Sequence, residues 1–188
     1  DDVRNLMLSP SAGIDQQMLI DTRPLAGQIL ATLQSDARLH DLSAKFAVQL
    51  DGGEGLAMLE HPHDLWLSAV ERGDEQRWAF GLAGCPTDIP ASSVSLDQGH
   101  ALVVAVLELF LELARPDQTR MRHLLAECSL DGFLARLAAR VQLMTIEGWQ
   151  RTATPSGLHI RAHLQCDADR VYIGAVPPLG RLDPAMLR

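Results

Sequence analysis

Apolar positions at helical spacing predict two long helices in this chain. The first begins with Asp21 or Thr22 as its cap and has Pro24 in its first turn. The second follows Ser95 and Gln98, which form a capping-box pattern. The apolar stripes are Leu25, Ile29, Leu30 and Leu33 in the first helix, up to about Gln34, and Leu102, Val103, Val106, Leu109, Phe110 and Leu113 in the second, up to the break at 115–117. Two shorter helices are expected at about 120–126 and 131–142.

Shorter apolar runs between turn residues predict strands. The expected strands are 4–9, 45–50, 64–71, 76–84, 159–165 and 170–176. The third and fourth form a hairpin around 72–75, with Trp78, Phe80 and Leu82 on the face that points to the core. This order predicts an α+β fold with a mostly antiparallel sheet covered by helices.

The sequence pattern changes after Leu143. Residues 149–157 are typical of a loop, and Asp183–Pro184 indicates a helix that starts six residues before the chain stops. We therefore expect one domain over 1–143, followed over 144–188 by a linker and the start of a second unit. Both ends of the chain look cut from a longer protein.

Composition excludes several classes of protein. The formal net charge of −8 argues against a nucleic-acid or membrane-surface binder, and the longest apolar run, 101–110, is too short to span a bilayer. No signal peptide is visible at the N-terminus. Cys85, Cys128 and Cys166 are too far apart for a zinc site or a self-contained iron–sulfur site, and such sparse thiols fit a reducing cytoplasm.

Few residues suggest catalysis or metal binding. Asp21 with Asp51 or Glu54 could form a carboxylate pair, although the sequence equally explains these residues as capping and turn residues. The segment 61–63, His-Pro-His, resembles a chelate but has no third ligand near it in sequence. We expect no metal site in this chain, and the catalytic residues stay unknown.

The basic residues are more informative. Lys45 is the only lysine among the 16 Lys plus Arg residues. Arg4 opens the first predicted strand, Lys45 opens the second, and Arg120 and Arg122 begin a helix. If the two strands pair, Arg4 and Lys45 project from one edge toward an anionic ligand, since guanidinium and ammonium groups bind carboxylates. The alternative is that all four are solvated ends of elements.

Three stretches of the chain carry a resemblance to a known family. The sequence RNLMLSPSAGID over 4–15, followed by IDTRPLA over 20–26, resembles the start of a nitrite/sulfite reductase repeat, which reads R-N-V-x-x-x-P-x-A-G-x-D and then D-x-R-P-L-A. Lys45–Phe46 resembles the K-F strand of that repeat. The sequence VYIGAVPPLGRL over 171–182 resembles the ferredoxin-like half domain of the family, with its V-x-V-P-L-G-R-L pattern.

The resemblance implies an arrangement for the longer protein. Residues 1–143 would be the first repeat, and 144–188 a linker with the truncated start of the second ferredoxin-like half domain. The full-length protein would carry a [4Fe–4S] cluster whose ligands lie in a second repeat beyond this chain, against which this repeat would pack. In family members the positions of Arg4 and Lys45 face tetrapyrrole carboxylates or the substrate anion. Arg120 and Arg122 lie near a basic segment at a helix start.

Within the family, the form SPSAGID over 9–15 and the APPLGRLD-like form VPPLGRLD over 176–183 are most similar to the cobalamin-pathway branch, the precorrin-3B synthases. The segment 43–47, Ser-Ala-Lys-Phe-Ala, lacks the neighbouring arginine and the second cation of the P-R-K-F-K form in reductases. This loss suits an oxygen-dependent monooxygenase that converts precorrin-3A to precorrin-3B, of which this fragment alone would be inactive. The alternatives are a sirohaem nitrite or sulfite reductase and a non-catalytic tetrapyrrole-binding or structural repeat.

Overall fold

The computed structural model describes residues 6–152, 160–167 and 169–176. The helices are α1 (Arg23–Ser35), α2 (Gly99–Leu113), α3 (Met121–Leu125) and α4 (Leu130–Leu137), with short 3-10 helices at Ala37–Asp41 and Leu96–Gln98. The strands are β1 (Leu6–Leu8), β2 (Val48–Asp51), β3 (His63–Arg72), β4 (Glu75–Gly84), β5 (Ser92–Ser95), β6 (Ala162–Leu164) and β7 (Val171–Ile173). None of the helices in these ranges is long and apolar enough to cross a membrane.

The first five strands form one sheet in chain order, β1-β2-β3-β4-β5. Helix α1 connects β1 to β2, and the loop 52–62 connects β2 to β3; both pairs of strands are parallel. The β3–β4 and β4–β5 pairs are antiparallel. The α+β fold class is confirmed. The sheet is mixed and not mostly antiparallel as predicted, because its first two connections are crossovers that place β1, β2 and β3 parallel.

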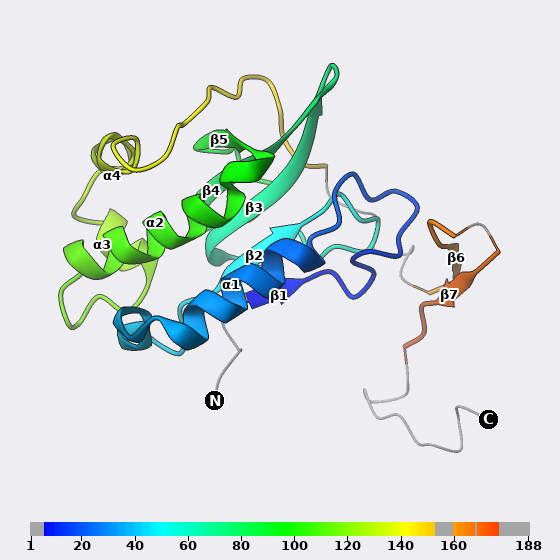
Figure 1. The fold of residues 1–188 in the computed structure, drawn as a ribbon, viewed down its shortest axis with the longest axis horizontal. Coiled ribbons are helices and arrows are strands. Elements are labelled where there is room, and N and C mark those ends of the chain that lie inside the picture. The colour runs from blue at the N-terminus through cyan, green and yellow to red at the C-terminus, as the bar shows by residue number, and fades with distance from the viewer. Residues whose placement is uncertain (1–5, 153–159, 168, 177–188) are drawn as a thin grey trace.

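Helices α1 and α2 lie side by side over one face of this sheet (Figure 1). Ile29 of α1 and Val106 of α2 are at most 1% exposed and share one core with Trp78 and Phe80 of β4. Each such side chain contributes roughly 1.5–3 kcal/mol by leaving water. The predicted core face of the hairpin is confirmed, with Leu82 half-buried at its end.

The hairpin between β3 and β4 forms as its local sequence predicts. Arg72 pairs with Glu75, which leaves Gly73 and Asp74 as the turn. Gly73 has a φ of +61°, a conformation that costs glycine little. On the face of the sheet away from α1 and α2, the ring of Trp66 lies against Gly81.

Two predicted boundaries are wrong. The second strand begins at Val48, and Lys45 lies in a turn before it. The capping box also does not form: the Ser95 hydroxyl donates to Asp97, and α2 begins only at Gly99. A serine hydroxyl bonds within a tight turn in both cases. Ser43 Oγ accepts from the amide of Lys45 before the strand, and Ser95 Oγ donates to Asp97 before the helix.

Strands β6 and β7 form a separate hairpin beside the loop that follows β1 (Figure 1). The amide of Cys166 donates to the carbonyl oxygen of Ile14 at 2.8 Å, and Gln165 forms a β-bridge with Asp15. The two strands at 159–165 and 170–176 are thus confirmed, with shorter bounds. The division after 143 stays a prediction, and the helix start at Asp183–Pro184 lies outside the described residues.

Candidate functional site

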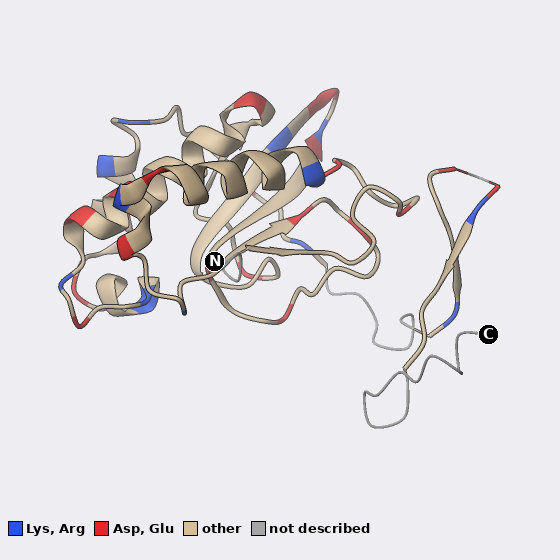
Figure 2. Cartoon of the chain, turned by 60° about the horizontal axis from the view of Figure 1, so that its bottom comes forward, with Lys and Arg blue, Asp and Glu red and all other residues tan. Residues whose placement is uncertain are grey.

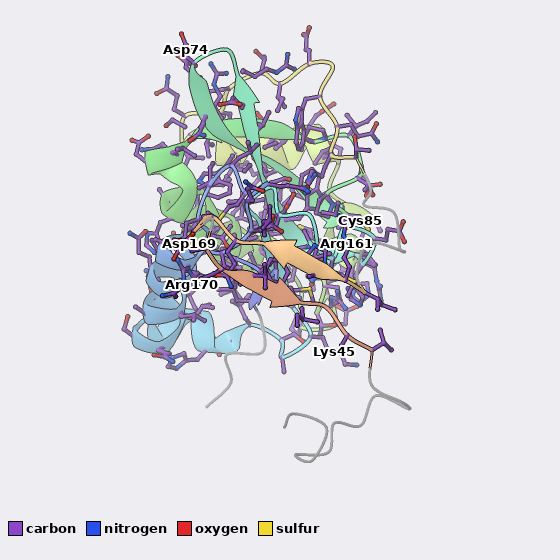
Figure 3. All side chains as sticks on the ribbon, turned by 90° about the vertical axis from the view of Figure 1, so that its right-hand side faces the viewer. Lys45, Asp74, Cys85, Arg161, Asp169 and Arg170 are labelled. Atoms are coloured by element: carbon purple, nitrogen blue, oxygen red, sulfur yellow. The ribbon has the colours of Figure 1, made fainter. Side chains whose placement is uncertain are left out.

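Lys45 lies exposed in the turn before β2, at the periphery of the domain (Figure 3). Its amide donates to Ser43 Oγ at 3.2 Å, which holds the turn. Among the described residues its ammonium forms no ion pair. Because β1 and β2 are parallel, with Leu6 opposite Val48, both strands begin at the same end of the sheet. Arg4, the other cation predicted for this edge, lies outside the described residues.

A buried carboxylate organises the chain next to Lys45. Asp64, which is 2% exposed, accepts hydrogen bonds from the amides of Ala47 at 2.9 Å and Met121 at 2.8 Å. It also forms an ion pair with Arg120, whose Nε lies 2.8 Å from Asp64 Oδ2. This carboxylate therefore joins the end of the Lys45 turn to β3 and to the start of α3.

The four predicted cations consequently differ in their surroundings. The charge of Arg120 neutralises Asp64 and is largely covered, with 21% of its side chain exposed. Arg122 is exposed on α3. Basic residues are spread over several elements in the view of Figure 2. Lys45 thus stands as an accessible ammonium on a turn whose backbone is fixed by a buried acid.

A second polar cluster occupies the opposite end of β2. Asp51, which is fully buried, pairs with Arg151 at 2.9 Å and accepts a hydrogen bond from Ser68. Glu54 Oε2 accepts from the amide of Gly52 at 2.7 Å, whereas its Oε1 is buried without a partner among the described residues. Burial, together with the charge of Asp51, raises the pKa of Glu54 from 4.5 to about 7.

Asp51 and Glu54 therefore belong to one cluster, whereas the pair considered from the sequence was Asp21 with one or the other of them. Asp21 does not join them, because its carboxylate pairs with Arg23 at 2.8 Å and lies at the start of α1. Residue spacing did not predict Arg151, which reaches Asp51 from 100 residues further along the chain. The only available signal was a pair of acids around two glycines directly after a buried strand.

The described residues do not supply the ligands of a metal or an iron–sulfur cluster. No group of three or more His, Cys, Asp or Glu side chains in those ranges could hold a metal ion. His63 is buried and its Nδ1 bonds the carbonyl oxygen of His61 at 2.7 Å. Burial lowers the pKa of His63, as expected for a neutral core histidine.

Comparison with known proteins identifies the family. The family described as "Nitrite and sulphite reductase 4Fe-4S domain" matches residues 1–143. A chloroplastic ferredoxin–nitrite reductase of Arabidopsis thaliana is 31% identical over 75% of this chain and 26% of its own length. The corresponding protein of Zea mays is 28% identical over 98% of this chain and 36% of its own length. A precorrin-3B synthase of Sinorhizobium sp is 31% identical over 56% of this chain and 22% of its own length.

The fold has a solved counterpart in the NirA protein of Mycobacterium tuberculosis. The two share a TM-score of 0.71 at 15% identity, over 87% of this chain and 32% of that one. This chain spans about a third or less of the length of the relatives named above. Since the family match covers 1–143, more than half of the chain, the chain belongs to the nitrite and sulphite reductase 4Fe-4S domain family.

Proposed function

We propose that this chain is part of a precorrin-3B synthase and that its role is to bind a carboxylate arm of precorrin-3A. The observation that carries the proposal is the exposed ammonium of Lys45, on the turn that precedes β2, which forms no ion pair within the part of the chain that the structure describes. The position two residues later is Ala47, so the segment offers one cation where reductases of the family often have more. One cation suffices to bind a carboxylate of a tetrapyrrole substrate and provides little charge for a small inorganic anion.

In this proposal Lys45 binds the carboxylate arm of the substrate, and Asp64 positions the turn that carries Lys45. The ammonium forms a charge-assisted hydrogen bond with an acetate or propionate arm. Asp64 holds the amide of Ala47, two residues from Lys45, and so limits the movement of the turn. Arg120 forms an ion pair with Asp64 and holds it in place. These residues fix where the substrate lies and carry out no chemical step themselves.

The iron–sulfur cluster of the family is assigned to other residues of the longer protein. Cys85, Cys128 and Cys166 lie in three separate loops, after β4, between α3 and α4, and between β6 and β7, and the described residues offer no cluster-binding set. We therefore derive no step of the reaction through a cluster in this chain. Its part in the reaction, in this proposal, is substrate binding and packing against the second repeat.

A sirohaem nitrite or sulfite reductase is the second candidate. The plant ferredoxin–nitrite reductases favour it, because they match 75% to 98% of this chain whereas the precorrin-3B synthase matches 56%. In that case Lys45 would bind the same kind of carboxylate on sirohaem. A non-catalytic tetrapyrrole-binding repeat would use Lys45 in the same way.

Product analysis of the full-length protein separates these candidates. The protein is incubated with precorrin-3A, ¹⁸O₂ and a reductant, and in parallel with nitrite or sulfite and reduced ferredoxin. We expect one labelled oxygen atom in the tetrapyrrole product and no consumption of nitrite or sulfite. Consumption of either anion without labelled product would instead establish a reductase, and neither reaction would favour the non-catalytic repeat.

A further inference from the structure

A cavity lies between the loop that follows β1 and the β6–β7 hairpin. Its volume is about 270 Å³, and its walls include Asp15, Gln17, Leu56, Arg161 and His163. We call it the hairpin cavity. Concave sites lined by side chains from several segments of the chain are common positions for ligands. It is distinct from the Lys45 turn, none of whose residues line it.

One end of the hairpin cavity carries a positive charge that forms no ion pair within the described residues. Arg161 is exposed at the start of the hairpin and forms no ion pair with the described residues. Figure 3 shows it at one end of the hairpin, with Asp169 and Arg170 at the other end. Arg170 is neutralised by Asp167, 3.2 Å away. Arg161 is thus the cation of this hairpin that remains available to a ligand.

The acid in the cavity is already satisfied. Asp15 Oδ2 accepts from Gly55 N at 3.0 Å, from the Tyr172 hydroxyl at 3.0 Å and from Ser11 Oγ at 3.2 Å. Its Oδ1 accepts from Gln17 N at 2.8 Å. Four donors therefore share the charge of Asp15. The pKa of Tyr172 is raised chiefly by burial and by its hydrogen bond to Asp15, so that the hydroxyl keeps the proton it donates.

A nitrogen of the cavity wall lacks a partner. The ring of His163 stacks on Tyr172, with ring centroids 4.8 Å apart and planes 10° apart, so its orientation is fixed. Its Nε2 is buried and has no hydrogen-bond partner among the described residues. A buried polar atom in this position costs free energy until a ligand or water satisfies it.

We propose that the hairpin cavity binds the carboxylate of a short aliphatic acid. Arg161 would form the ion pair and His163 Nε2 would donate to the second carboxylate oxygen. Leu56 also lines the cavity, on the side of the main domain, and suits the aliphatic chain. The ligand is either a free acid or the propionate arm of a larger molecule, since both present the same group. The proposal does not depend on which reaction the longer protein carries out.

Titration of the histidine ring signals with sodium propionate tests the proposal. Sodium chloride keeps the ionic strength constant, and a His163→Gln variant identifies the signal of His163. We expect a saturable shift of that signal, and roughly tenfold weaker binding in Arg161→Gln, the loss of one charge-assisted hydrogen bond. Arg170→Gln is the matched control, because it removes a neutralised arginine of the same hairpin, and it should bind like the unaltered protein.

Three results would overturn the proposal. They are a shift that does not saturate, equal binding by Arg161→Gln and Arg170→Gln, and an equal shift with 1-propanol, which has the same chain without the charge. A second titration with coproporphyrin identifies the source of the carboxylate. A His163 shift with coproporphyrin as well as propionate supports an arm of a larger molecule, and a shift with propionate alone supports a free acid.

Discussion

Replacing Glu54 by glutamine should stabilise the protein in a pH-dependent way. Glu54 is fully buried, and its pKa is raised from 4.5 to about 7 by burial and by the charges of Asp51 and Asp15. Each pKa unit corresponds to about 1.4 kcal/mol, so ionised Glu54 costs the folded protein about 3 kcal/mol. Glutamine keeps the carbonyl oxygen that accepts from Gly52 and carries no charge.

The direction in which stability changes with pH follows from the pKa of Glu54 in the unfolded and the folded protein. Folding takes up a proton on Glu54 between pH 4.5 and about 7, so the stability from this group is complete below pH 4.5 and falls as the pH rises through 7. Glu54→Gln should therefore raise the free energy of unfolding by about 3 kcal/mol at pH 8 and by about 1 kcal/mol or less at pH 5.

Urea unfolding of both proteins at the two pH values measures this difference. His63, whose pKa is lowered by burial, titrates in the opposite sense but is present in both proteins, so it cancels. Glu71→Gln, at an exposed position of β3, is the control and should change stability by less than about 0.5 kcal/mol at either pH. An effect of Glu54→Gln that is the same at pH 5 and pH 8 would refute the reasoning.

Two further predictions concern stability: one tests the Asp64–Arg120 ion pair and the other tests the packing of Gly81 against Trp66. Asp64→Ala should destabilise the protein by about 3–5 kcal/mol, because it leaves Arg120 and two amides unpaired, and Arg120→Ala should cost less because both amides keep their acceptor. Urea unfolding checks this order, and equal costs would contradict it. Gly81→Ala should cost about 1–3 kcal/mol, because its Cβ would lie 2.4 Å from Trp66 Cζ2, whereas Gly27→Ala, which meets nothing within 4 Å in α1, should stabilise by about 0.5–1 kcal/mol. A thermal midpoint for Gly81→Ala at or above that of Gly27→Ala would show that the Trp66 ring moves aside freely.

Local sequence was sufficient for elements whose determinants are close in the chain. The hairpin of β3 and β4 depends on alternating apolar residues around a glycine turn, and α2 depends on one continuous apolar stripe. The start of β2 could not be predicted in this way. Lys45 and Phe46 have the sequence of a strand, but the Ser43 hydroxyl and the Asp64 carboxylate hold them as a turn and its exit.

The polar clusters depend on contacts that spacing does not reveal. Asp64 meets Arg120 across 56 residues, and Asp51 meets Arg151 across 100. The sequence showed Arg120 only as a charge at a helix start. The fold shows that this charge forms an ion pair with the buried Asp64. His163 alternates with apolar neighbours in β6, but its stacking on Tyr172 requires the register of the β6–β7 hairpin.

Binding of precorrin-3A, or of a stable analogue, by full-length Lys45 variants tests the central claim most directly. Lys45→Ala should weaken binding by roughly 10- to 150-fold, the loss of one charge-assisted hydrogen bond, with the fold intact. Lys45→Arg should also bind poorly, because a planar guanidinium does not replace a compact ammonium at a close contact. Arg136→Ala, at an exposed position of α4, should bind like the unaltered protein. Unchanged affinity in both Lys45 variants would contradict the account and make Lys45 a solvated surface residue.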